Sequence, residues 1–155
     1  KAMLPSMKLA DLAETKAEEI ARQWVVNVQK NAMTPYYHNR PPEKLIPQAV
    51  RFYKNFRKIF TEPKPIEAGR EFFTRYAIER YQDGVPLHEA IYALILMRRQ
   101  LWLYAEFQAV FTTAMEKHQA VDSLNRTILV FDYAMYFITK KYYEMMQEGW
   151  MEKEG

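Results

Sequence analysis

The sequence predicts an all-α protein, folded as a single five-helix bundle with a long central helix and a long C-terminal helix. Only 4 glycines stand against 9 methionines and 11 tyrosines, which leaves few of the glycine turns that β-hairpins require. Hydrophobic residues recur at a spacing of three and four in five segments, and three of the four breaks between these segments contain proline or glycine. With 155 residues, of which 49% are hydrophobic, one domain spanning residues 1–155 can enclose its own core.

The first two helices are predicted from their amphipathic patterns. Apolar residues recur at helical spacing from about Leu9 to Val28, opposite acidic and amide side chains. The segment Asn31–Pro42 contains three prolines, so it is expected to be a loop that wraps a helix end. A second helix follows over Glu43–Phe60 with one broad aromatic face, and Pro47 falls in its first turns, where a missing N–H is tolerated.

The third helix and the corner after it are predicted from helix-terminating residues. Thr61–Pro65 is a rigid stop, after which Ile66–Gln82 has helical periodicity. The corner Asp83–Pro86 places a glycine after one helix and a proline at the start of the next, the positions that these residues favour. We therefore expect a tight helical hairpin around this corner.

The last two helices are predicted to be long. Leu87 to about Lys117 is apolar nearly all round in its middle, so this helix is either central or packs a second face on another subunit. The final helix is expected from Val121 to about Trp150. Its charged tail, residues 147–155, is interpreted as the start of a connecting helix that continues into a larger protein. A homodimer and a C-terminal output domain of the same chain are the expected partners.

Residue types that catalyse reactions are sparse. The absence of cysteine excludes disulfides, thiolate nucleophiles and thiolate metal sites and favours a cytoplasmic setting. The three histidines, His38, His88 and His118, stand apart from one another, and no glycine-rich phosphate loop is present. We therefore expect no catalytic residues, no metal and no cofactor, and interpret the chain as non-enzymatic.

Charge and hydropathy exclude two further classes. The formal net charge of +3 comes without a long block of like charges, so no nucleic-acid-binding surface is expected. The most apolar stretches end well short of the roughly 20 residues that a membrane-spanning helix needs. No insertion into a membrane is expected.

The most informative polar residues are those in apolar surroundings, since an unpaired buried charge costs several kcal/mol. Arg98, Arg99 and Asp132 are the leading cases. If the corner near Gly84 is a hairpin, Glu71 lies level with Arg98, and these two are the preferred ion pair. A later turn near Gln119 would leave Asp132 to pair with the first helix or with a tyrosine hydroxyl.

Two interpretations of these residues remain open. Either they form structural salt bridges, or they line a polar site that binds a small anionic effector between helices. The candidate ligand-binding residues are Arg98, Glu71, Asp132 and Trp102.

Several motifs resemble one family. The corner segment Ala77–Leu87 (AIERYQDGVPL) is followed by Ala90, Leu94 and Arg98, and the last helix carries Leu124-Asn125-Arg126 before Asp132. This pattern is similar to the amino-terminal domain of the RsbR-type co-antagonists of the RsbT kinase. The resemblance implies a dimeric helical sensor module that precedes a STAS domain, a histidine kinase or another output domain, and passes a change along its last helix.

The sequence thus favours a regulatory input domain of a bacterial stress-signalling protein. The alternative is a helical carrier or sensor that binds a small molecule or haem, with His88 as the candidate axial ligand because its helix is rich in apolar residues.

Overall fold

The computed structural model describes residues 7–107 and 112–154, and this part of the chain contains helices and no strand. The predicted all-α class is confirmed, but the described residues form six α-helices rather than five. The predicted first helix is divided at Lys16 into α1 (Lys8–Thr15) and α2 (Ala17–Lys30). The Thr15 hydroxyl donates to the Asp11 carbonyl at 2.9 Å, a side-chain bond that competes with the helical ladder just before the break.

The predicted loop and the next two helices lie close to their expected places. A short 3-10 turn, η1 (Pro35–Tyr37), follows α2, and α3 (Pro42–Thr61) and α4 (Pro65–Gln82) come next. The loop wraps the end of α2, where the buried Thr34 hydroxyl donates to the Val28 carbonyl at 2.8 Å. Pro47 is accommodated inside α3, as the sequence predicts.

The last two helices differ from the predicted ones at their junction. Helix α5 spans Leu87–Phe107 and α6 spans Ala114–Glu154, so the final helix starts before the predicted Val121. Residues 108–111, which were predicted to continue the fourth helix, lie outside the described residues. The early start makes α6 a helix of 41 residues.

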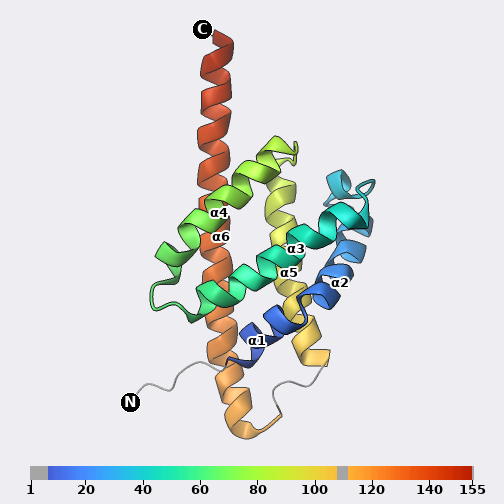
Figure 1. The fold of residues 1–155 in the computed structure, drawn as a ribbon, viewed down its shortest axis with the longest axis vertical. Helices are drawn as coiled ribbons and strands as arrows, with labels where there is room; N and C mark the ends of the chain where they lie inside the picture. Colours follow the sequence, from blue (N-terminus) through green and yellow to red (C-terminus); the bar gives the residue numbers. More distant parts are fainter. Residues whose placement is uncertain (1–6, 108–111, 155) are drawn as a thin grey trace.

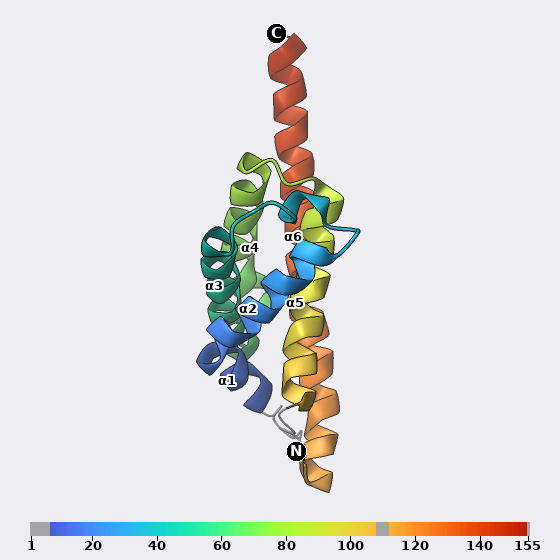
Figure 2. The same cartoon turned by 90° about the vertical axis from the view of Figure 1, so that its right-hand side faces the viewer.

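The helices form two layers (Figures 1 and 2). Helices α5 and α6 lie side by side along the long axis, and α1–α4 cross them on one side. Helix α4 packs mainly against α6 and α2 against both α3 and α5. The predicted helical hairpin of α4 and α5 is therefore wrong: the chain turns at the corner, but α4 crosses to α6 instead of lying along α5 (Figure 1).

An aromatic cluster joins the two layers. The Phe52 ring on α3 lies 5.5 Å from Tyr76, 6.0 Å from Phe73 and 5.4 Å from Phe131 on α6. Gly69 permits this packing, since a Cβ there would lie only 2.5 Å from the Phe73 ring. These buried rings fix α4 between α3 and α6.

Candidate functional site: a seam on the last helix and a polar corner

Helix α6 has one buried face and one exposed face, on opposite sides of the helix. One face is buried in the bundle. Its buried residues are Ser123, Thr127, Val130, Phe131, Ala134, Phe137, Ile138 and Tyr142.

The opposite face repeats every seven residues and is exposed. We call it the α6 seam; its members are Leu129, Asp132, Tyr136, Thr139, Tyr143, Met146 and Trp150. Leu129 is 39% exposed, Tyr136 59%, Tyr143 64% and Trp150 60%. A seven-residue repeat of apolar side chains is the pattern that pairs helices into coiled coils. Large exposed apolar surfaces of this kind mark interaction sites.

The outer side of α5 extends the seam. A groove of about 700 Å³ lies between the loop after α2, the start of α5 and Thr139 of the seam. It is lined by Ala32, Met33, Pro35, Leu87, His88, Ile91, Tyr92, Ile95 and Thr139. The seam and this groove therefore form one continuous, largely apolar face.

The structure pairs Arg98 with Asp132, not with Glu71. Arg98 Nη1 lies 4.0 Å from Asp132 Oδ1, whereas the exposed Glu71 carboxylate accepts from Arg75 at 2.8 Å on the solvent side of α4. The predicted Glu71–Arg98 pair is wrong because α4 and α5 do not form the assumed hairpin. The assumed turn near Gln119 is also wrong, because α6 begins at Ala114 and its first turns extend past the end of α5 in both views (Figures 1 and 2).

The remaining candidate, Trp102, is half-buried on α5 and packs against the edge of the core. The four candidate residues are thus not gathered in one pocket. Arg98 and Asp132 meet at the seam, and Glu71 points away from both.

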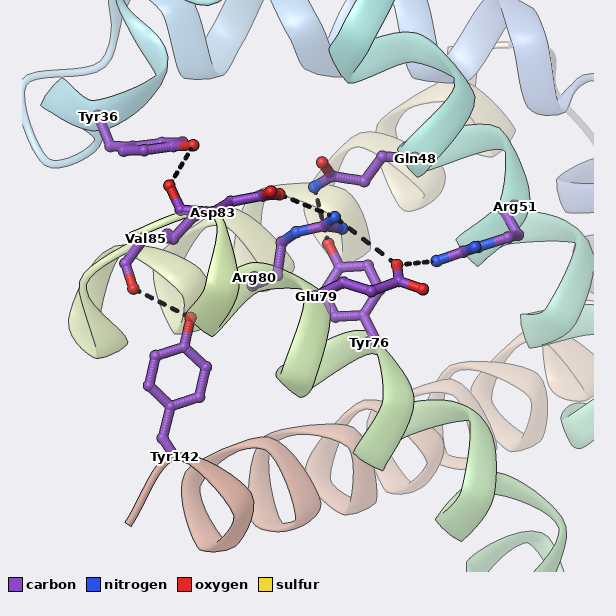
Figure 3. Close-up of polar contacts among 9 residues, drawn as sticks. All are labelled: Tyr36, Gln48, Arg51, Tyr76, Glu79, Arg80, Asp83, Val85 and Tyr142. Atoms are coloured by element: carbon purple, nitrogen blue, oxygen red, sulfur yellow. Dashed lines mark hydrogen bonds and ion pairs between the residues drawn. The ribbon is translucent and has the colours of Figure 1, made fainter. Parts of the chain in front are cut away.

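The corner between α4 and α5 is a polar cluster that sequence analysis missed (Figure 3). Gly84 has a φ of 84°. The Val85 N–H donates to the Arg80 carbonyl and the Gly84 N–H to the Tyr81 carbonyl, both at 3.0 Å. This is a Schellman ending, which requires a left-handed residue at the glycine position.

Arg80 lies at the centre of the corner with only 8% of its side chain exposed. Its Nη2 donates to Asp83 Oδ2 at 3.1 Å and lies 3.7 Å from Glu79 Oε2. The guanidinium also stacks 4.8 Å from the centre of the Tyr76 ring, a cation–π contact. Although burial lowers the pKa of Arg80, Tyr76 and Asp83 outweigh it and the pKa is raised.

Three buried polar atoms at this corner have no hydrogen-bond partner among the described residues: Tyr37 Oη and Arg80 Nε and Nη1. Burial holds the pKa of Tyr37 well above its usual range, and Tyr76 raises it further. The charges of Arg80 and Arg51 are balanced by Asp83 and Glu79. The corner therefore has open donors but no excess of positive charge that would favour an anion.

The corner connects the loop after α2 with the last helix. The Tyr36 N–H donates to the buried Glu89 carboxylate at 2.7 Å, and the Tyr36 hydroxyl to the Asp83 carbonyl at 3.1 Å. On the other side, the Tyr142 hydroxyl donates to the Val85 carbonyl at 3.0 Å (Figure 3). Tyr142 is the last fully buried residue of α6, so the corner holds α6 at the point where it leaves the bundle.

A second polar line fixes α2 on α5. The Asn27 amide donates to Gln100 Oε1 and the Gln100 amide to Gln23 Oε1, both at 2.6 Å. Tyr104 donates to Glu19 at 2.7 Å, and burial, together with this bond, raises the pKa of Tyr104 to about 12. These groups are satisfied by one another, which indicates a structural role.

Metal and membrane sites are not evident in the described part of the chain. No group of three or more His, Asp or Glu side chains there is arranged to hold a metal ion. None of the described helices is both long and apolar enough to cross a membrane. His88 lines the apolar groove, and His38 is exposed and lies 2.7 Å from the Asn31 carbonyl.

Comparison with known proteins found no matching family model, no matching curated protein and no matching solved structure. The site is therefore defined by its own geometry: an exposed seven-residue repeat along α6, and a buried polar corner that holds α6 at the point where it leaves the bundle.

Proposed function

We propose that this chain is a dimeric regulatory input domain of a bacterial signal-transduction protein, which controls a C-terminal output domain through α6. The observation that carries the proposal is the α6 seam. A helix of 41 residues that buries one face in its own bundle and exposes a second apolar face is suited to pairing with another helix.

The self-pairing of α6 is favoured over other partners by the character of the seam. Its repeat continues through Tyr143, Met146 and Trp150, beyond the last fully buried residue of the bundle. Two copies in parallel would bring these side chains together along the extension and place both C-terminal ends side by side. An output domain after α6, such as a histidine kinase or a STAS domain, would then receive a paired helix.

The polar corner supports the regulatory part of the proposal. A change at the loop after α2 would reach Glu89 and Asp83 through Tyr36, and then reach α6 through Val85 and Tyr142. The contacts of Tyr36 with Glu89 and Asp83, and of Tyr142 with Val85, are direct hydrogen bonds, and Asp83 and Val85 are two residues apart in the same corner. The resemblance of the corner sequence to RsbR-type domains supports the same role.

Light scattering and disulfide trapping test the dimer. The chain has no cysteine, so Met146→Cys introduces a single thiol on the seam and Glu148→Cys a matched thiol two residues on, away from the seam. We expect a dimer, with rapid cross-linking of Met146→Cys and little of Glu148→Cys. A monomer at high concentration, or equal cross-linking of both variants, would overturn the proposal.

The regulatory role is tested in the full-length protein. Locking the seam with the Met146→Cys disulfide should change the activity of the output domain, and reduction should restore it. An output activity that is identical in the locked and reduced states would contradict control through α6.

A second candidate function is a small-molecule carrier, favoured by the apolar groove at His88. Its volume of about 700 Å³ is within the range of ligand sites. Native mass spectrometry and an absorption spectrum of the purified protein test this candidate, because a retained ligand would add mass and a bound haem would give a Soret band. Neither signal is expected if the groove belongs to the dimer face.

A further inference from the structure

The α6 seam carries one charged residue in its middle, Asp132. It lies between Leu129 and Tyr136, and its side chain is 59% exposed. If two seams pair, Asp132 is removed from water. A carboxylate buried at an interface without a partner is strongly unfavourable, so the seam requires a cation at this level.

The cation within the same chain is poorly placed. Arg98 Nη1 lies 4.0 Å from Asp132 Oδ1, the limit of an ion pair, and neither side chain makes a hydrogen bond with any other described residue. The Arg98 side chain is still 28% exposed. It is therefore available to a second acceptor on the same face of the molecule.

Two-fold symmetry brings that acceptor into place. In a parallel pair of α6 helices, each residue lies at the same height along the axis as the same residue of the partner copy. Arg98 stands at the level of Asp132 on the neighbouring helix α5, so it also stands at the level of the partner copy's acid. The face is self-complementary, since it carries one acid and one base at the same height within an apolar surround.

We propose that Arg98 of one copy binds Asp132 of the other across the dimer, in two symmetric ion pairs that fix the register of the α6 seams. This inference rests on the proposed dimer and adds its central contact. The 4.0 Å contact with Asp132 of the same chain then keeps Arg98 next to the α6 seam. Dimerisation lets Arg98 form its ion pair with Asp132 of the second copy.

Charge exchange between two variants tests the inference. Asp132→Arg and Arg98→Asp each place like charges across the interface. Each is expected to weaken the dimer by about 30-fold or more, measured by sedimentation or light scattering. An equimolar mixture of the two variants restores both ion pairs in a heterodimer, whose mixed mass is resolved by native mass spectrometry. We expect the mixture to dimerise within a few-fold of the unmodified chain.

The controls separate the possible failures. Arg99→Asp makes the same charge change at the next residue and should not rescue Asp132→Arg; rescue by Arg99→Asp would overturn the assignment to Arg98. If the pair forms only within one chain, the double variant Arg98→Asp/Asp132→Arg recovers while the mixture stays monomeric, which would overturn the inference and leave the dimer standing. A monomeric unmodified chain would overturn both. Circular dichroism of each variant confirms that the bundle is folded.

Discussion

Two buried tyrosines provide a matched test of the polar contacts in the structure. Tyr37 and Tyr53 are 1% and 0% exposed. The Tyr53 hydroxyl donates to the Met97 carbonyl at 2.9 Å and ties α3 to α5, whereas the Tyr37 hydroxyl has no partner among the described residues. Substitution of either by phenylalanine removes one oxygen and keeps the ring.

The two substitutions should therefore have different effects on stability. Tyr53→Phe loses a buried hydrogen bond and should lower the free energy of unfolding by about 1 kcal/mol. Tyr37→Phe removes a buried hydroxyl that is not hydrogen-bonded, a group whose desolvation costs about 1–3 kcal/mol. It should leave stability unchanged or raise it by up to about 1 kcal/mol. The ring contact of Tyr37 with Trp24, 5.9 Å between centroids, is retained in Tyr37→Phe.

Urea unfolding measures the difference between the two variants. With an unchanged slope, a shift of the midpoint reports stability directly, and 1 kcal/mol corresponds to a change of about 2–4 °C in melting temperature for a chain of this size. A loss of more than about 1 kcal/mol for Tyr37→Phe would refute the reasoning. That result would mean that the Tyr37 hydroxyl is hydrogen-bonded in solution.

Three further predictions concern backbone conformation and ionisation. Gly84→Ala should destabilise the bundle by about 1–2 kcal/mol because of the positive φ alone, since a Cβ there meets nothing within 4 Å; a neutral result in chemical unfolding would contradict the Schellman ending. Gly149→Ala, inside α6 with its Cβ at a normal 3.9 Å from the Tyr81 hydroxyl, should instead increase stability by up to about 1 kcal/mol, measured in the same way. Above about pH 10, tyrosines ionise in the unfolded chain, whereas the buried tyrosines of the folded protein stay protonated. The free energy of unfolding should therefore fall by about 1.4 kcal/mol per pH unit for each tyrosine with a raised pKa. An absorbance titration of the folded protein should show that these tyrosines ionise at higher pH than the exposed ones. Ionisation of all tyrosines together, at a pH where the protein is still folded, would contradict this prediction. These tyrosines are Tyr37, Tyr53, Tyr104 and Tyr142.

Local signals in the sequence predicted most of the fold. Helix periodicity placed α3 and α4 within one or two residues, and the Gly84 corner has the predicted helix ending. The break at Lys16 was not predicted because apolar periodicity continues across it without a proline or glycine. The start of α6 was missed because a polar run after Phe111 is compatible with either a turn or a first helical turn.

Ion pairing was predicted less well, because it depends on which helices cross. Two helices joined by a short corner can lie along one another or diverge, and the sequence at Gly84 is compatible with both. The assumption that the two helices form a hairpin therefore gave Glu71 as the partner of Arg98, which is wrong. The polar corner around Arg80 was missed for a different reason: a single arginine near a helix end is typical of a solvated surface. Besides Tyr76 on its own helix, the buried Arg80 interacts with Tyr37 of η1, which is distant in sequence.

The geometry of a straight helix constrains any partner of the α6 seam. A seven-residue repeat drifts by about 20° per heptad around an ideal α-helix. From Leu129 to Trp150 the seam covers three such repeats, so it turns by about 60° around α6. Up to Tyr142, the bundle holds α6 by buried aromatic packing and by the bond to Val85. Beyond it, none of the described side chains of α6 is fully buried. The left-handed supercoiling that keeps two seams in contact must therefore be absorbed mainly by residues after Tyr142, which makes the extension, rather than the bundle, the part of α6 that is free to change its winding.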